Sequence, residues 1–395
     1  MWRTSPGTEQ VKPLKTAADK RDERRVQSIM EWSGQQQNAI DAVAKWHKAG
    51  ADQVLRVFGY AGTGKTTLAK HFADSIEGRT EFAAFTGKAA IVMQKNGCIG
   101  ASTIHSLIYR AETDEDTGDA IFKLDSSGAA RDAALIVIDE CSMVDKAIGT
   151  DLMSFGVPIL VLGDPAQLPP VKGGGFFTDQ TPDIMLTEIH RQAADNPIIR
   201  LATEVRMGRT PDYGQYGESR VISAADIDAA QVTAADQVLV GTNRSRHLYN
   251  RRLRDLLDKT DPLPMMGDRL VCIRNDRLKK IFNGGLFDVV RSQPHPEKKG
   301  CVRLTIASED FPTRSALTVT VREEFFLGGA ESIDWRDLRG QQQFNYGYAL
   351  TVHKAQGSQW NDVVLFDESR VFGDDRQRWL YTGITRASER ITIVR

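Results

Sequence analysis

Apolar and polar positions alternate in blocks along most of the chain. Short β-branched runs, such as VLRVF at 54–58 and LIVIDE at 135–140, are each followed by a turn and an amphipathic segment. Repeated strand–turn–helix units of this kind predict parallel sheets with helices on both faces, and ligand sites at the carboxyl ends of the strands. The sequence therefore predicts an α/β protein.

A second series of such units begins after about residue 206 and is interrupted by a different pattern. Between 265 and 340, alternating segments such as CVRLTIA (301–307) are separated by glycine, proline and charged turns, which predicts a small antiparallel barrel or sandwich. The α/β pattern then resumes and finishes with the apolar run ITIVR at 391–395. In the first series, the polar segment 108–131 has turn residues at its centre and predicts a projecting β-hairpin.

These patterns predict several structural units, because 395 residues exceed the size at which single cores stop growing. We expect a polar extension at 1–30, a first α/β domain at 31–205 containing the hairpin 108–131, a second α/β domain formed by 206–264 and 341–395, and a β insertion at 265–340.

Composition adds limits but no function. The chain is 41% hydrophobic and 26% charged, with a formal net charge of −1, so it gives no sign of a nucleic-acid partner, although a local basic groove is compatible with that total. Four widely spaced cysteines predict reduced thiols and a cytosolic compartment. No apolar run reaches membrane-spanning length. The basic, polar first thirty residues are most simply a solvated extension; a nucleic-acid-binding arm is the alternative.

One motif carries specific chemistry. GYAGTGKT follows a predicted strand, precedes a predicted helix, and fits the pattern G-x-x-x-x-G-K-[ST]. Its glycines let backbone N–H groups surround phosphates, Lys65 neutralises phosphate oxygens, and the Thr66 hydroxyl serves Mg²⁺. The alternative is an accidental glycine-rich turn. The predicted ATP-binding residues of this loop are Gly59, Ala61, Gly62, Thr63, Gly64, Lys65, Thr66 and Thr67.

Further polar residues follow other predicted strands. Asp139 and Glu140 end a strand, where we expect Asp139 to hold Mg²⁺ with Thr66 and Glu140 to act as general base on water; charge at a helix start is the alternative. Gln167, in GDPAQLPPV, is placed to sense the γ-phosphate and to move the adjoining Pro169–Pro170 turn, although an ordinary proline-rich turn explains that segment equally well. Gln36 suits the edge of an adenine, or is simply an exposed residue at a helix start.

Taken in order, the motifs resemble those of a superfamily 1B DNA helicase of the RecD/Dda type. The resemblance extends from about residue 32 to the end of the chain and rests on nine segments. They are WSGQQQNAI, GYAGTGKTT, TGKAA, STIH, VIDECSMVD, GDPAQLPPV, IHRQ, TVHKAQGSQW and YTGITRA.

The resemblance implies two RecA-like P-loop domains with tandem parallel sheets, a hairpin inserted in the first and an SH3-like β-barrel inserted in the second. It implies ATP and Mg²⁺ as ligands and 5′→3′ movement on single-stranded DNA. Gln36, Gln356 and Gly357 would face the nucleotide, and Arg191 and Arg386 would be arginine fingers from opposite sides of the cleft. The implied DNA contacts are Thr86, Lys88, Thr103, His105, Pro169, Thr242, Asn243, Thr351, His353 and Lys354.

Further expectations concern the nucleic acid. The TVHKAQG segment is predicted to lie on a helix beginning near Tyr348, and the hairpin to act as a strand-separating pin without an aromatic tip. Candidates for base stacking are Phe85, Phe176, Phe177 and Tyr346, for each of which burial is the competing role. We expect binding to single strands and to junctions with duplex, docking of replication or recombination proteins, and a monomeric chain.

Three other functions remain open from the sequence. A translocase on DNA or RNA would move without efficient unwinding, and a non-motor module would use ATP only as a switch. The second is disfavoured because Glu140, Gln167, Arg191 and Arg386 form a complete hydrolytic set. A nuclease is disfavoured because no additional acidic cluster of that type is evident.

Overall fold

The structure is a computed structural model that describes residues 32–113, 120–170, 175–189, 195–276, 279, 281–338 and 340–395. The predicted extension at 1–30 lies outside the described residues. Within them, no helix is long and apolar enough to cross a bilayer. All four cysteines are buried and free, as predicted from their spacing.

The first sheet has six parallel strands in the order β3-β2-β6-β7-β1-β8. Every residue of β6 is buried: Leu135 and Val137 pack into one core cluster, whereas Ile136 and Ile138 pack into the other. Such a strand reads as continuously apolar because helices cover both sheet faces. The strands are β1 (Val54–Gly59), β2 (Thr80–Ala84), β3 (Ser102–Thr103), β6 (Leu135–Asp139), β7 (Ile159–Gly163) and β8 (Ile184–Leu186).

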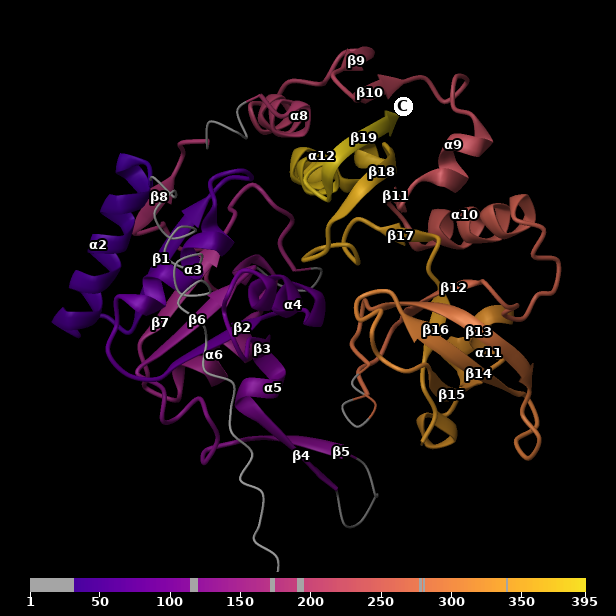
Figure 1. The fold of residues 1–395 in the computed structure, drawn as a ribbon, viewed down its shortest axis with the longest axis horizontal. Helices are drawn as coiled ribbons and strands as arrows, with labels where there is room; N and C mark the ends of the chain where they lie inside the picture. Colours follow the sequence, from indigo (N-terminus) through magenta and orange to yellow (C-terminus); the bar gives the residue numbers. More distant parts are fainter. Residues whose placement is uncertain are drawn as a thin grey trace, which may run out of the picture.

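Helices of this domain lie on both faces of the sheet. Residues of α2, α3 and α4 join one core cluster, and those of α5 and α6 join the other. The helices are α2 (Gly34–Ala49), α3 (Lys65–Asp74), α4 (Gly87–Lys95), α5 (Ile104–Ile108), the 3₁₀ helix η1 (Cys141–Met143) and α6 (Lys146–Met153). The predicted hairpin is confirmed: β4 (Tyr109–Thr113) pairs antiparallel with β5 (Ala120–Leu124) and projects from the domain (Figure 1).

The second sheet also has six strands, in the order β17-β11-β18-β19-β10-β9, and only the β9–β10 pair is antiparallel. Its strands are β9 (Gly214–Tyr216), β10 (Ser219–Ile222), β11 (Gln237–Val240), β17 (Ala349–Thr351), β18 (Trp360–Phe366) and β19 (Ala387–Val394). Its helices are α8 (Pro197–Arg206), α9 (Ala229–Ala234), α10 (Asn243–Leu256), η4 (Ser369–Asp375) and α12 (Arg376–Ile384).

Two domain boundaries differ from the predicted ones: the start of the second α/β domain and the end of the insertion. The apolar face of α8 joins the same core cluster as Trp379 of α12 and Leu365 of β18, so the second domain begins before Pro197 rather than at 206. The amphipathic pattern of α8 identifies a helix but not the sheet on which it packs, which explains the error.

The insertion forms a five-stranded antiparallel sheet in the order β15-β14-β13-β12-β16. It lies beside the first domain and below the second sheet (Figure 1). Because β16 pairs with β12, the insertion extends past the predicted limit of 340. Its elements are β12 (Arg269–Cys272), β13 (Leu286–Pro294), β14 (Cys301–Ser308), β15 (Leu317–Arg322), α11 (Glu324–Leu327), η2 (Ala330–Ser332), η3 (Trp335–Leu338) and β16 (Phe344–Tyr346).

The prediction of a helix beginning near Tyr348 is wrong. Residues Ala349–Thr351 form the buried strand β17, which pairs in parallel with β11, and turns follow as far as Gly357, whose φ is +74°. Pairing with β11 decides the structure of this segment and outweighs its helical spacing of residues. Its three consecutive buried residues fit the strand at the edge of the sheet. His353 and Lys354 therefore lie on turns at the carboxyl end of β17.

Candidate nucleotide site between two parallel sheets

The glycine-rich loop joins β1 to α3 at the carboxyl edge of the first sheet. Gly62 and Gly64 have φ values of +83° and +80°, a region that favours glycine. A Cβ on Gly59 would lie 2.6 Å from the Thr63 hydroxyl, so this position also lacks room for a side chain. The loop thereby presents backbone N–H groups and the amino end of α3 to an anion.

Two side chains at the start of α3 are already ordered by protein groups. Lys65 Nζ donates to the carbonyls of Gly59 (2.7 Å) and Tyr60 (3.0 Å). The Thr66 hydroxyl donates to Asp139 Oδ2 at 2.7 Å, which brings two hard oxygen ligands together. This pair of oxygens beside a phosphate loop fits the donor chemistry that Mg²⁺ prefers.

The acidic pair lies at the end of β6. Burial raises the pKa of Asp139, while the hydrogen bonds from Thr66 and from the Glu140 amide oppose that shift. Glu140 has a φ of +53°, a strained conformation for a non-glycine residue, and such strain is concentrated at functional positions. Burial also raises the pKa of Glu140, and the positive charge of Arg386 is the largest opposing influence. Arg386 therefore acts electrostatically on Glu140 from the second domain.

Gln36 closes the amino side of the loop. It forms a reciprocal capping box with Ser33 at the start of α2, and its Nε2 donates to the Thr63 carbonyl at 3.1 Å. Its exposed-helix-start alternative is wrong, because the side chain is buried against the phosphate loop. One amide N–H and one carbonyl lone pair remain for a ligand.

Helix α12 of the second domain contacts the loop directly. The Tyr381 hydroxyl accepts from the Ala61 amide at 2.8 Å and donates to Asp164 Oδ2 at 2.6 Å. Beside it, the Thr382 hydroxyl accepts from the Leu168 amide at 2.9 Å. Both sheets thus contribute side chains to one buried junction at the phosphate loop.

Gln356 and Gln167 complete this junction. Gln356 Nε2 donates to the Leu168 carbonyl at 2.9 Å, whereas Gln167 Oε1 is buried and has no partner among the described residues. A small cavity of about 40 Å³ adjoins Gln167 and also touches Ser142 and Arg378. A buried unpaired acceptor is costly, so this oxygen is available for a ligand or for water.

The two predicted arginine fingers have different outcomes. Arg386 directly follows α12 and its cap, and is only 4% exposed. Its guanidinium donates to the carbonyls of Thr382 (3.0 Å) and Ser358 (3.3 Å) and to the Thr385 hydroxyl (3.1 Å). Arg191 lies outside the described residues, so its role stays a prediction.

Comparisons with known proteins bear on this arrangement. An AAA domain model matches residues 31–226, and a UvrD-like helicase C-terminal domain model matches residues 346–394. The ATP-dependent RecD2 DNA helicase of Deinococcus radiodurans is 29% identical over 389 residues, which is 91% of this chain and 48% of that protein. The chain belongs to the superfamily 1B helicases and is similar to RecD2.

Other relatives of this helicase chain are more distant. The probable conjugal transfer protein TraA of Sinorhizobium fredii is 25% identical over 82% of this chain and 29% of its own length. This chain thus spans less than half the length of these relatives. The structure of Pif1 helicase from Bacteroides in complex with ADP-AlF3 and ssDNA has a TM-score of 0.57 at 17% identity and covers 92% of each chain. The structure of Pif1 helicase from Candida albicans has a TM-score of 0.53 at 19% sequence identity.

Several predicted DNA contacts of this superfamily 1B helicase are helix caps. The hydroxyls of Thr86, Thr103 and Thr242 accept from backbone amides at the starts of α4, α5 and α10. Gly357 contacts one of them so closely that a Cβ would lie 2.5 Å from the Thr86 hydroxyl. Gly357 therefore joins the second domain to this threonine, and its predicted contact with the nucleotide stays a prediction.

The remaining predicted contacts have varied surroundings. The Asn243 side chain accepts from Arg246 at 3.3 Å, and the Thr351 hydroxyl accepts from the Lys354 amide at 3.2 Å. Burial lowers the pKa of His353, whose ring packs against Phe372. The ring of His105 lies between those of Phe85 and Tyr109, and Pro169 lines the 40 Å³ cavity.

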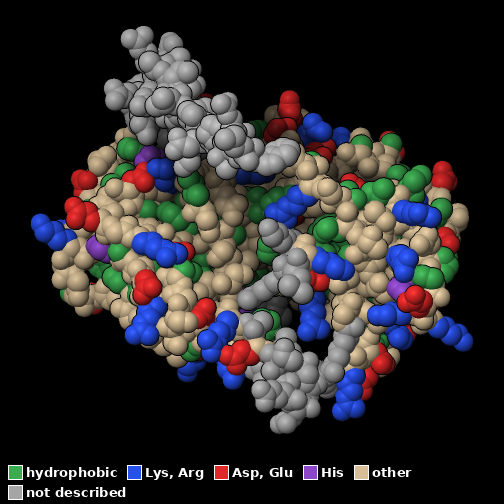
Figure 2. Space-filling view, turned by 60° about the horizontal axis from the view of Figure 1, so that its bottom comes forward, with side chains coloured by type: hydrophobic (Ala, Val, Ile, Leu, Met, Phe, Trp, Pro, Cys, Tyr) green, Lys and Arg blue, Asp and Glu red, His purple; other side chains and the backbone are tan. Residues whose placement is uncertain are grey.

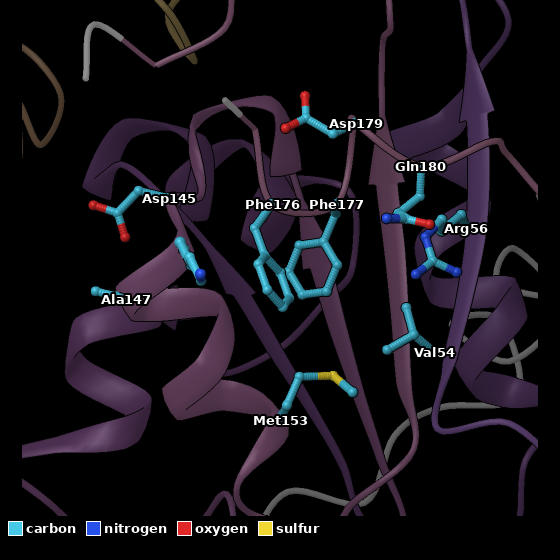
Figure 3. A pocket seen from close by; sticks show the side chains of 10 residues that line it. Val54, Arg56, Asp145, Ala147, Met153, Phe176, Phe177, Asp179 and Gln180 are labelled. Carbon is cyan, nitrogen blue, oxygen red and sulfur yellow. The ribbon is translucent and has the colours of Figure 1, made fainter. Parts of the chain in front are cut away.

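A larger cavity lies elsewhere in the first domain. It has a volume of about 720 Å³ and is lined by Val54 and Arg56 of β1, by residues of α6 and by Phe176 and Phe177 (Figure 3). Val54 begins β1, whereas the phosphate loop follows its end, so this cavity is separate from the nucleotide site. Phe177 is fully buried and cannot stack on a base, and Phe176 packs against Gly149.

The other two aromatic candidates also pack within the protein. Phe85 packs against the first-domain core, and Tyr346 lies against Phe326 with the guanidinium of Arg254 4.2 Å from its ring centre. No sequence motif predicted the bridging roles of Tyr381 and Thr382, or the cation–π contact in which Arg206 lies 3.6 Å from the centre of the Tyr60 ring. The quoted motifs contain both bridging residues, but nothing local signals their partners.

Proposed function

We propose that this chain is an ATP-driven motor that moves 5′→3′ along single-stranded DNA and unwinds the duplex ahead of it. The observation that supports this most is the junction between the domains, in which Tyr381 bonds to the phosphate loop, Thr382 bonds to Leu168, and the charge of Arg386 acts on Glu140. A site divided between two domains makes hydrolysis depend on their closure. The RecD2 likeness over 91% of the chain agrees with it.

Each residue of the site has a proposed task. Lys65 gives up its hydrogen bonds to two loop carbonyls and binds β- and γ-phosphate oxygens instead. Gln36 uses its remaining N–H donor and carbonyl acceptor to bind the edge of the adenine. Glu140 takes a proton from the attacking water, and Arg386 both favours the ionised carboxylate and neutralises charge on the transferred phosphoryl group. Mg²⁺ bound at Thr66 and Asp139 would supply further charge neutralisation to the phosphates.

Coupling to DNA follows from shared elements. Gln167 precedes Leu168, whose amide and carbonyl bond Thr382 and Gln356 in the second domain. A bond donated by the Gln167 side-chain N–H group to the γ-phosphate would therefore alter a segment that both domains hold. Release of phosphate would weaken the bonds of this junction. The predicted DNA contacts of the first domain would then move relative to those of the second.

The proposed DNA surface uses groups suited to phosphate rather than to base edges. Capped helix starts and lysines position a strand without reading its sequence, which predicts sequence-tolerant, salt-sensitive binding. Figure 2 shows Lys and Arg side chains around the middle of one face of the molecule, despite the net charge of −1. Because one chain contains both parts of the site, we take the monomer as the motor.

The test is unwinding of duplexes that carry a 5′ tail, a 3′ tail or no tail, alongside ATPase assays with single-stranded DNA and RNA. We expect unwinding of the 5′-tailed substrate only, and ATP hydrolysis stimulated by DNA. Stimulated ATPase without unwinding would favour the translocase alternative. Preference for the 3′ tail would contradict the polarity, and hydrolysis indifferent to nucleic acid would contradict the motor.

A Lys65→Ala variant provides the reference for these assays. It should remain folded and lose turnover, because the phosphates lose their principal cation. Lys70→Ala is the matched control on the same helix, since Lys70 is exposed and pairs with Asp74. Hydrolysis by Lys65→Ala at the rate of the control would contradict the assignment of the phosphate loop.

A further inference from the structure

The antiparallel insertion covers Lys88, one of the predicted DNA contacts. Asp310, in the loop after β14, places Oδ1 3.5 Å from Lys88 Nζ, and each of the two side chains is only 13% exposed. The ammonium also lies 4.4 Å from the ring centre of Trp360 in β18. This contact therefore joins the insertion, the first domain and the second domain at one cation.

A second loop of the insertion covers Lys354. The Asn-Gly-Gly turn that precedes β13 closes through a bond from the Gly285 amide to the Phe282 carbonyl at 2.9 Å. Asn283 Oδ1 on this turn accepts from Lys354 Nζ. Burial lowers the pKa of Lys354 to about 8, which agrees with a lysine withdrawn from solvent.

The same turn also contacts the first domain beside Lys88. Phe282 packs on Gly87, the first residue of α4, so closely that a Cβ on Gly87 would lie 2.7 Å from Phe282 Cβ and Cγ. Glycine at this position is what allows the turn to dock. The insertion thus contacts two lysines from two domains through a carboxylate and an amide, and it contacts Gly87 through the Phe282 ring.

We propose that the Asp310 loop and the 282–285 turn form a latch that must leave Lys88 and Lys354 before a DNA strand can contact them. The inference rests on the proposed function, because it takes both lysines as phosphate contacts. The oxygens of Asp310 and Asn283 accept the N–H bonds that a phosphate would accept. Since those oxygens occupy the lysine ammonium groups, the strand and the latch compete for the same groups.

The competition is balanced finely enough to be reversible. A part-buried ion pair, one amide hydrogen bond and one aromatic contact are each weak interactions. The contacts of a bound strand can replace that sum, so DNA would shift the insertion from its latched to its released position. Removing a latch residue without touching a lysine should therefore strengthen DNA binding.

The experiment measures binding of a dye-labelled oligothymidine to the full chain by fluorescence anisotropy, without nucleotide and at low salt. Asp310→Ala should bind roughly fivefold more tightly than the wild type, the scale of one ion pair. Glu297→Ala is the matched control, because it removes the same charge from an exposed turn of the same insertion. The control should change affinity by less than about twofold, which excludes a general effect of net charge.

A double-mutant cycle assigns the gain to the lysine. If Asp310 acts by covering Lys88, the combination Lys88→Ala with Asp310→Ala should bind no more tightly than Lys88→Ala alone. Gly87→Ala should release the 282–285 turn from the first domain without changing any charge, since the added methyl group displaces Phe282. It should also tighten binding, and it keeps the test valid should Asp310→Ala fail to fold.

The outcomes separate the two proposals. Tighter binding by Asp310→Ala that requires Lys88 supports the latch. Binding by Asp310→Ala and Gly87→Ala that equals or falls below a measurable wild-type affinity overturns it, while the motor stands. A wild-type chain that binds no single-stranded DNA contradicts the proposed function itself, and the latch fails with it.

Discussion

Arg386 is held by three hydrogen bonds to its own domain, yet it influences a carboxylate in the other. Its guanidinium is thus fixed before any nucleotide binds, and fixed donors lose little reorganisation energy when charge develops. Lys65 differs, because its ammonium must leave the carbonyls of Gly59 and Tyr60 to reach phosphate. The site therefore combines one preorganised cation with one that ligand binding rearranges.

This difference predicts the behaviour of Arg386→Ala. Nucleotide affinity should stay within about tenfold of the wild type, whereas DNA-stimulated turnover should fall by roughly a thousandfold, the lower range for arginine fingers. Arg390→Ala is the matched control, because Arg390 is half exposed and pairs with Asp362 on the outer part of β19. Nucleotide titration and steady-state ATPase give the two quantities, and normal turnover by Arg386→Ala would refute the cross-cleft role.

Lys354 gives a prediction in pH. Its pKa of about 8 means that the side chain is charged below pH 8 and neutral above it, while the nearby Cys272 thiol, with its pKa raised to about 12, stays protonated. A neutral amine cannot pair with phosphate, so affinity for single-stranded DNA should fall roughly fivefold between pH 7 and pH 9. Lys354→Arg remains charged and should show a flatter profile. Parallel profiles for the two proteins would remove Lys354 from the DNA surface.

At the scale of elements, the hairpin β4–β5 is a two-stranded sheet separate from the first-domain sheet. Replacing residues 111–122 by a short glycine–serine turn should therefore leave ATP binding intact, because no residue of the nucleotide site lies there. If the hairpin separates strands, unwinding of 5′-tailed duplex should fall at least about tenfold while single-stranded DNA still stimulates ATPase. Equal loss of both activities would indicate a folding defect, and loss of neither would dismiss the pin.

Elements also show what the sequence could and could not predict. The phosphate loop, the acidic pair and the hairpin were predictable because each depends on residues that are near one another in the chain. The Tyr381 bond to Ala61 joins residues 320 positions apart, and no local pattern encodes it. For the same reason α8 was predicted in the wrong domain, and a helix was predicted where β17 pairs with β11. In both cases contacts with segments distant in the sequence determine the structure.

At the scale of the whole molecule, the bonds from α12 and Gln356 to the first domain hold the two sheets in contact. Tyr381 links the phosphate loop to Asp164, and Leu168 bonds to both Thr382 and Gln356. Each of these hydrogen bonds is individually weak, which is compatible with opening and closing within a catalytic cycle. Stepping requires that the bound nucleotide change this equilibrium, since a ligand shifts only states that it binds differently.

Domain movement can be measured directly because all four native cysteines are buried. Dyes on Lys48→Cys in α2 and Glu389→Cys in β19, both exposed positions in different domains, report the distance by energy transfer. An ATP analogue should hold the closed arrangement, and nucleotide-free protein should spend more time open. Tyr381→Phe removes the hydroxyl that joins Ala61 to Asp164 and should raise the open fraction without nucleotide. Identical transfer efficiency in every nucleotide state would mean that hydrolysis in this cleft does not move the domains.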